Sequence, residues 1–183
     1  EHLWAEIFDR EMTAENLFAI QSEISEKIAH ALEATLSPEE EERINDFPTQ
    51  SLEAYNAYLR GRQLLPLRNS KDLTQAKKEF EKAVELDPEF ALAWVGIAEA
   101  TNLMGSHASI NPDIQFETMD LAITRALEIN PQLGEAYTSQ GSLLDDLYRP
   151  AESEAAYKRA IEFSPNYATT YQWYALLISR THN

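Results

Sequence analysis

Residues that could do acid–base or metal chemistry are scattered along this chain. It contains no cysteine, and its four histidines stand far apart, at His2, His30, His107 and His182. His30 could share a helix face with Glu26 or Glu33 as a metal site, but no second histidine or cysteine stands at ligand spacing, so a solvated amphipathic helix is favoured. The five glycines fall at separate positions and form no phosphate-binding loop. The sequence therefore predicts no catalytic residues, no cofactor and no metal.

A run of four acids, Glu39–Glu42, has two interpretations. It could bind a cation or a basic partner. Ser37 and Pro38 precede it, an order typical of a helix start with a capping residue and proline at the first helical position. Acids in a first turn offset the helix macrodipole, so a helix N-terminus is the favoured interpretation.

A fifteen-residue block occurs three times in the chain, at Phe80–Trp94, Ile123–Tyr137 and Tyr157–Tyr171. The second and third copies begin 34 residues apart, and the first and second begin 43 apart. A repeat of this length indicates one supersecondary unit stacked on itself, and the unit then decides the fold class.

Each copy has a small residue ahead of a shared proline and an aromatic residue six positions after it; the small residues are Ala83, Ala126 and Ala160. The proline ends one helix, because it pushes the residue before it out of the α region. This pattern resembles the tetratricopeptide repeat (TPR), a helix–turn–helix unit of 34 residues. The resemblance implies an all-α fold in which antiparallel helix pairs form a right-handed superhelix, with the small residues allowing close approach.

The resemblance covers residues 48–183 and divides them into units at 50–88, 89–131, 132–165 and, in part, 166–183. Helices are predicted near 14–36, 50–65, 71–86, 90–104, 113–129, 133–147, 151–163 and 167–181. The first unit departs from the pattern: its aromatic, Tyr58, stands one place off, and its inter-helix stretch Pro66–Ser70 is long. The second carries an insertion, Gly105–Pro112, in which Asn111 is predicted to cap the next helix. Because the fourth unit has only its first helix, we expect the array to continue.

The inner surface of such an array is the predicted binding site. The resemblance implies that ten partner-binding residues face this groove: Tyr58, Arg62, Val95, Glu99, Asn102, Thr138, Ser142, Asp145, Gln172 and Leu176. Leu65 and Ser179 lie in the same rows. TPR proteins that clamp a terminal carboxylate need convergent donors, and this set has one arginine among acids, hydroxyls and apolar groups, so no carboxylate clamp is predicted. We expect a basic or mixed apolar peptide, or another part of the parent protein; alternatively the groove is empty and packs against further repeats.

The groove assignment also predicts the cost of substitutions. Ala126→Leu or Ala160→Leu should destabilise the fold by about 1–3 kcal/mol, whereas Glu99→Ala on the groove surface should change stability by less than about 0.5 kcal/mol.

Four aromatic residues near the C-terminus could stack on a ligand: Tyr167, Tyr171, Trp173 and Tyr174. Tyr171 and Tyr174 match packing positions of the repeat, so the core is favoured for them. Trp173 lies off that stripe.

Residues 1–47 form a different segment. His2–Phe8 is a short apolar run that predicts a strand, and Leu17–Leu36 has apolar residues at helical spacing. The run Leu3–Arg10 with Phe18–Ile24 resembles the end of the TolB-like α/β domain, which precedes TPR arrays in bacterial regulatory proteins, some with an adenylate-cyclase or winged-helix domain upstream. The resemblance implies a strand–helix remnant of that domain followed by a linker helix.

The net charge is −16, and residues 1–47 hold 13 acids against 3 bases. Such a surface repels phosphate backbones, which argues against nucleic-acid binding. No apolar run is long enough to cross a membrane; the cytoplasm is favoured, with the periplasmic side of a membrane-anchored parent as the alternative. The predicted function is a non-catalytic protein-interaction module of a bacterial signalling or transcription-regulatory protein. The alternative is an accessory domain of an enzyme such as a nucleotide cyclase. A homodimer through the apolar ends is possible.

Overall fold

The structure, a computed structural model of the chain, describes residues 13–31, 47–107 and 110–181. It comprises two compact units, Glu1–Leu52 and Glu53–Asn183. Each unit is described by itself.

The first unit contains one described helix, α1 (Ala14–Ala31). The hydroxyl of Thr13 accepts a hydrogen bond of 3.1 Å from the backbone N–H of Asn16, so a capping threonine begins the helix. Phe18 is 2% exposed, and its ring centroid lies 5.3 Å from that of Phe47. The predicted strand at 2–8, the predicted extension of the helix to residue 36 and the helix start at Ser37 all lie outside the described residues.

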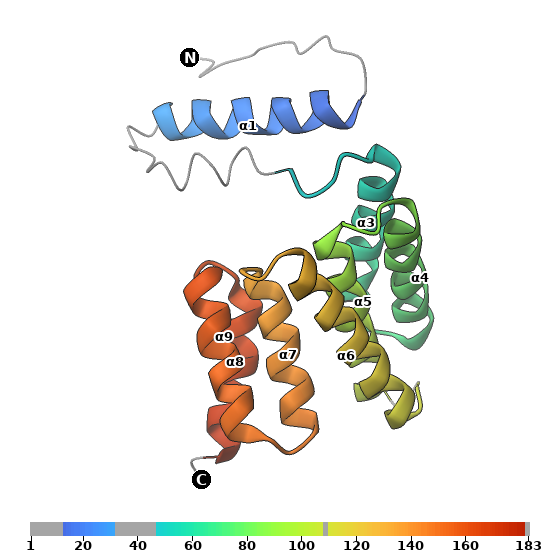
Figure 1. Cartoon of the computed structure of the whole chain (residues 1–183), viewed down its shortest axis with the longest axis vertical. Helices are drawn as coiled ribbons and strands as arrows, with labels where there is room; N and C mark the ends of the chain where they lie inside the picture. The colour runs from blue at the N-terminus through green and yellow to red at the C-terminus, as the bar shows by residue number, and fades with distance from the viewer. Residues whose placement is uncertain (1–12, 32–46, 108–109, 182–183) are drawn as a thin grey trace. The chain divides into compact units, whose positions relative to one another are not determined.

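The second unit is an array of helices (Figure 1). The helices are α3 (Leu52–Leu64), η1 (Leu65–Leu67), α4 (Ser70–Leu86), α5 (Ala91–Ser106), α6 (Pro112–Ile129), α7 (Gly134–Asp146), α8 (Pro150–Phe163) and α9 (Ala168–Thr181). From α4 onward each helix packs against the next in sequence, and α3 meets α4 where Gly61 lies against Phe80. Helix α7 also contacts α5 on one side and α9 on the other, so the three helices form one layer. All regular structure in the described residues is helical, which confirms the predicted all-α array of antiparallel helix pairs.

The turns within the three blocks repeat one hydrogen-bond pattern. The aromatic residue of each copy donates to the carbonyl of the proline six residues before it. The bonds are Trp94 Nε1 to Pro88 (2.9 Å), Tyr137 Oη to Pro131 (3.1 Å) and Tyr171 Oη to Pro165 (2.8 Å). A carbonyl beyond a helix end lacks a helical donor, so a side chain supplies one. This explains why the position holds Trp or Tyr and never Phe in the three copies.

The insertion of the second unit ends as predicted. The side chain of Asn111 accepts a hydrogen bond of 2.8 Å from the N–H of Asp113, and Pro112 is the first residue of α6. The polar cap and the proline together fix the point at which α6 begins.

Close approach between helices depends on glycines and alanines. Phe80 of α4 is fully buried between Gly61 of α3 and Gly96 of α5, and a Cβ at either glycine would lie 2.6 or 2.5 Å from its ring. Tyr157 of α8 is likewise fully buried against Gly141 of α7. A bulky ring on one helix therefore fills the space left by a missing side chain on its neighbour.

Enlarging a small position should destabilise the array. Ala160 is fully buried in α8, and a Cβ at Gly134 would lie 2.7 Å from its carbonyl oxygen, so α7 and α8 are already close there. We expect Ala160→Leu to lower the free energy of unfolding by about 1–3 kcal/mol, because added methylenes force strain. Ala155→Leu is the matched control, exposed on the same helix, and should stay within about 0.5 kcal/mol. Chemical denaturation measures both; equal effects would contradict the packing.

Candidate functional site

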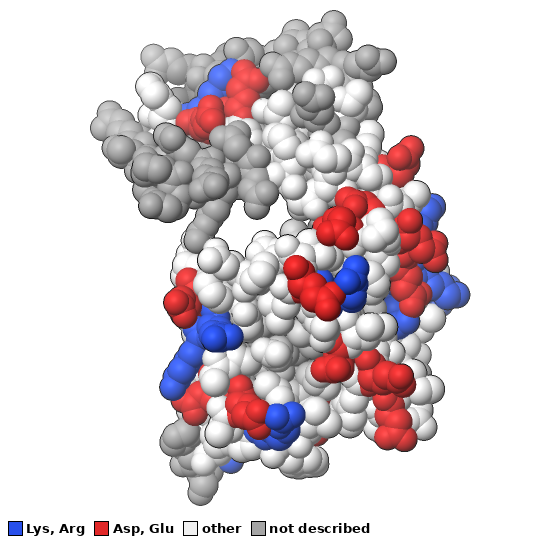
Figure 2. All heavy atoms as spheres, viewed as in Figure 1, with Lys and Arg blue, Asp and Glu red and all other residues white. Residues whose placement is uncertain are grey.

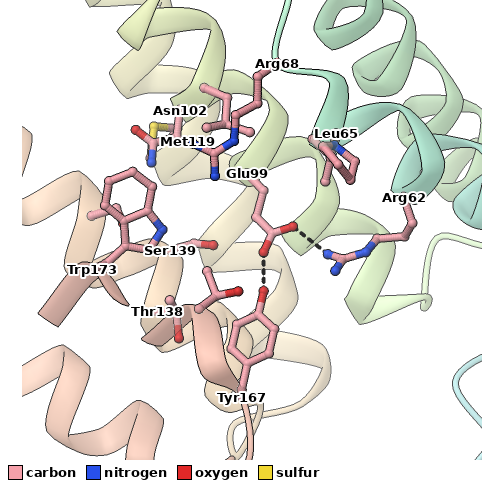
Figure 3. Close-up of a pocket in the computed structure, with 14 residues that line it drawn as sticks. Arg62, Leu65, Arg68, Glu99, Asn102, Met119, Thr138, Ser139, Tyr167 and Trp173 are labelled. Atoms are coloured by element: carbon pink, nitrogen blue, oxygen red, sulfur yellow. Dashed lines mark hydrogen bonds and ion pairs between the residues drawn. The ribbon is translucent and has the colours of Figure 1, made fainter. Parts of the chain in front are cut away.

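A pocket of about 240 Å³ lies on the face formed by α3, α5, α7 and α9 (Figure 3). It is lined by Arg62, Leu65, Pro66, Arg68, Glu99, Asn102, Leu103, Met119, Thr138, Ser139, Ser142, Tyr167, Thr169 and Trp173. Successive helices of one layer each contribute side chains, so the pocket exists only when the helix pairs are stacked. Its volume suits the side chains of a short segment rather than a drug-sized ligand, for which pockets begin at about 300 Å³.

One carboxylate of the pocket is already paired. Glu99 Oε2 lies 2.7 Å from Nη1 of Arg62, and Glu99 Oε1 accepts a short hydrogen bond from the hydroxyl of Tyr167 (Figure 3). The Glu99 side chain is only 16% exposed and the Arg62 side chain 40%. Burial raises the pKa of Glu99, an effect that Arg62 and the Tyr167 hydrogen bond oppose. The three residues, hereafter the Glu99 tie, join α3 to α5 and to the turn before α9.

Three side chains with nitrogen donors in the pocket have no partner. Arg68, Asn102 and Trp173 line it, and within residues 47–107 and 110–181 their side chains form no hydrogen bond or ion pair. Arg68 is exposed, and Asn102 and Trp173 are half-buried. All three can donate hydrogen bonds, and the indole N–H and the guanidinium can only donate.

Two polar residues of α7 that line the pocket form hydrogen bonds to neighbouring helices. The hydroxyl oxygens of Thr138 and Thr170 are 2.6 Å apart, and those of Ser142 and Tyr157 are 3.2 Å apart. These bonds link α7 to α9 and to α8, so this wall of the pocket is fixed by its own hydrogen bonds.

The structure brings half of the predicted groove residues together. Five of the ten line the pocket: Arg62, Glu99, Asn102, Thr138 and Ser142. Leu65, predicted in the same rows, lines it too.

The other five predicted residues lie elsewhere. Tyr58 is half-buried, with its ring 5.0 Å from that of Phe90. Val95 is 2% exposed and belongs to a core cluster, so its side chain faces the interior. Asp145 forms a short ion pair with Arg180 of α9. Gln172 and Leu176 are exposed on α9 and line no part of the pocket.

Residues outside the predicted groove complete the pocket. Tyr167 and Trp173 line it, in keeping with the ligand-stacking alternative. Tyr174 packs on Tyr157 at 5.8 Å, as expected of a core position. The core prediction for Tyr171 is wrong: the residue is 45% exposed, and its hydroxyl donates to the carbonyl of Pro165 at the turn. The sequence did not indicate Arg68 as a site residue. It lies in a connector between helices, and helical periodicity assigns faces only to residues within helices. The long stretch between the helices of the first unit was the only indication that something extra lies there.

No group of three or more His, Cys, Asp or Glu that could hold a metal occurs in the described residues. None of the described helices is long and apolar enough to cross a membrane.

A family model described as tetratricopeptide repeat matches residues 67–90 and 134–167. The chain therefore contains TPR repeats, and the array of α3 to α9 is a TPR fold. The structure of the "First TPR of Spaghetti (RPAP3) bound to HSP90 peptide SRMEEVD" aligns with a TM-score of 0.55 at 16% identity, over 72% of this chain and 97% of that one. The likeness is one of fold.

Two curated relatives match part of the chain. "Putative adenylate cyclase 3" of Rhizobium meliloti (strain 1021) is 32% identical over 123 residues, which are 66% of this chain and 21% of that protein. "Small glutamine-rich tetratricopeptide repeat-containing protein 2" of Mycosarcoma maydis is 29% identical over 98 residues, which are 54% of this chain and 25% of that protein. The chain thus spans a quarter or less of the length of these relatives.

The Glu99 tie revises the expected cost of Glu99→Ala. The sequence predicts an indifferent groove surface, but the side chain is largely buried and bonded twice. Its removal leaves Arg62 and Tyr167 without their acceptor, and we expect a loss of about 1–2 kcal/mol, limited by the partial exposure of Arg62. Glu117→Ala, at an exposed glutamate of α6, is the control and should cost under about 0.5 kcal/mol. Equal denaturation midpoints for the two variants would contradict the tie.

Alkaline pH should weaken the fold through its buried phenols. Burial raises the pKa of Tyr58 and of Tyr157 from 10.0 to about 12. A phenol whose pKa is raised in the folded state stabilises fully below its unfolded pKa, and that contribution is lost as the pH rises through the folded value. The free energy of unfolding should therefore fall from about pH 10 towards pH 12.

Denaturation at a series of pH values, with tyrosinate absorbance recorded alongside, measures this loss. Tyr157→Phe should make the loss shallower, and Tyr148→Phe, at a residue 93% exposed, should not. Ionisation of every tyrosine at its ordinary pKa in the intact fold would show that the phenols are not buried.

Proposed function

We propose that this chain is a protein-interaction module of a larger bacterial signalling or transcription-regulatory protein, and that the pocket holds a short segment of its partner. The observation that carries the proposal is a pocket lined by α3, α5, α7 and α9 in which polar side chains without partners stand beside apolar ones. These donors are open to solvent, so acceptors of a ligand can take the place of water at them.

The apolar part of the pocket lining indicates which kind of side chain the bound segment carries. It includes Leu65, Leu103, Met119 and Trp173. Such a lining favours an aliphatic or aromatic side chain of the partner. Between the basic and the mixed apolar peptide that the sequence left open, the pocket favours the apolar one, because Glu99 is its only carboxylate and is already paired. The RPAP3 structure, in which a TPR is bound to an HSP90 peptide, supports a peptide as the form of the ligand.

The parent protein is part of the proposal. Residues 1–47 are proposed as the strand–helix remnant of a TolB-like domain with a linker helix, and residues 48–183 as the TPR array. The R. meliloti relative named as an adenylate cyclase supports the alternative that the array is an accessory domain of an enzyme such as a nucleotide cyclase. In either parent the array itself is proposed to bind and not to catalyse.

A selection from a displayed library of random octapeptides tests the pocket. Peptides enriched on the wild-type chain should lose at least about tenfold in affinity for Trp173→Ala, because a buried aromatic in the centre of an interface carries much of the binding energy. Tyr148→Ala, which removes an aromatic that is 93% exposed on the α7–α8 turn, is the matched control and should change nothing. Enriched peptides that bind the Trp173→Ala chain as tightly as the wild type would contradict the proposal.

A further inference from the structure

We infer that two copies of this chain pair with each other, with α4 of each copy lying along α6 of the other. The pairing is separate from the pocket, whose lining includes none of the residues that it uses. Both helices pack on α5, and their outer faces carry charges of opposite sign. Figure 2 shows acids gathered at the lower right, where Figure 1 places the start of α6, and charges of both signs along α4.

The outer face of α6 combines exposed apolar side chains with carboxylates. Ile114 is 56% exposed, and Leu121, two turns further along, is 59% exposed. Three exposed acids flank them, and none of the three forms an ion pair with another described residue: Asp113, Glu117 and Asp120. Like charges three or four residues apart on a helix repel each other. This surface, hereafter the α6 face, is therefore stabilised by a partner that covers its apolar residues and brings positive charge.

The outer face of α4 offers that positive charge. Three exposed lysines, hereafter the lysine strip, follow one side of the helix: Lys71, Lys78 and Lys82. Two carboxylates of the same helix are bonded to other bases, Glu79 to Arg60 and Glu81 to Lys77, and no described residue forms an ion pair with the strip. Lysine packs its methylene groups on apolar surface while its ammonium group stays in water. The strip can therefore cover Ile114 and Leu121 and still meet the acids beside them.

The charges of the two surfaces have the same spacing. Seven residues separate the first two lysines of the strip, and seven separate Asp113 from Asp120. Four residues separate the last two lysines, and four separate Asp113 from Glu117. Because both elements are α-helices with the same rise per residue, two lysine–carboxylate pairs come into register at once. This holds whether the two helices run parallel or antiparallel.

A second copy is the partner that this match favours, because one chain carries both surfaces. In a two-fold dimer each contact occurs twice, so α4 of the first copy meets α6 of the second, and α6 of the first meets α4 of the second. The net charge of −16 opposes association. At physiological ionic strength, however, exposed charges more than about 8 Å apart are largely screened, whereas pairs brought into contact are screened much less. The contacts between the strip and the α6 face therefore decide the outcome.

Charge reversal of each surface tests the dimer, with sedimentation equilibrium of the full chain as the measurement. The wild-type chain should show the mass of a dimer at about 200 μM in about 0.15 M salt. One variant reverses the lysine strip, with Lys71→Glu, Lys78→Glu and Lys82→Glu. The other reverses the α6 face, with Asp113→Lys, Glu117→Lys and Asp120→Lys. Circular dichroism should show the same helix content in all three chains, because the substituted side chains are exposed.

Both variants should raise the dissociation constant of the dimer at least about tenfold. The first makes the net charge of the chain more negative and the second makes it less negative. An effect of net charge alone would therefore weaken the dimer in the first variant and tighten it in the second. The exchange Lys158→Glu with Glu162→Lys on α8 keeps the net charge, and as the control it should leave the dimer unchanged.

A mixture of the two variants gives the sharpest result. The reversed α4 of one variant is acidic and the reversed α6 of the other is basic, and their remaining surfaces are also complementary. The mixture should therefore form a heterodimer about as tight as the wild-type dimer, although each variant alone is monomeric. A wild-type chain that stays monomeric at about 200 μM, a mixture whose variants stay apart, or an α8 exchange that weakens the dimer as much as the reversals would overturn the inference.

Discussion

This array depends on one packing constraint: an aromatic ring on one helix lies against a glycine of a neighbouring helix. Phe80 fills the space at Gly61 and at Gly96, and Tyr157 fills the space at Gly141. The first helices of successive pairs can then lie side by side, as α5, α7 and α9 do. The pocket follows from that layer, since its lining comes from the helices that the glycines bring together.

The fold could be predicted because its causes are local and repeated. Proline, capping residue and small position recur in each block, so the helix bounds were predicted to within a few residues. The site was predictable only where it follows the helical repeat: Arg62, Asn102 and Thr138 were found on the expected rows. Val95 stands in a predicted row but is buried, because the small Ala126 and Ala136 against it leave space for its side chain.

The rest of the site depends on contacts that no local pattern contains. Arg68 reaches the pocket from a connector whose left-handed residue is an arginine, although such backbone usually favours glycine. Glu99 lies on the expected row, but its burial and its pairing were not expected. Its partners Arg62 and Tyr167 stand 37 and 68 residues away along the chain, so no local pattern contains them. Periodicity predicts which face of a helix a residue lies on, but it does not predict which residue of another helix that side chain will bond. In this pocket the bonds from Arg62 and Tyr167 to Glu99 determine that no carboxylate is left free.

The Glu99 tie also bears on how the array comes apart. In a solenoid each repeat contacts only its neighbours, so end repeats can fray independently and stability is a sum of nearest-neighbour terms. Here Arg62 of α3 and Tyr167 of the turn before α9 meet on one carboxylate. Peeling α9 away must break the bond to Glu99 that also holds α3. Helices α3 and α9 are thereby coupled, and a molecule that loosens one of them changes the free-energy cost of detaching the other.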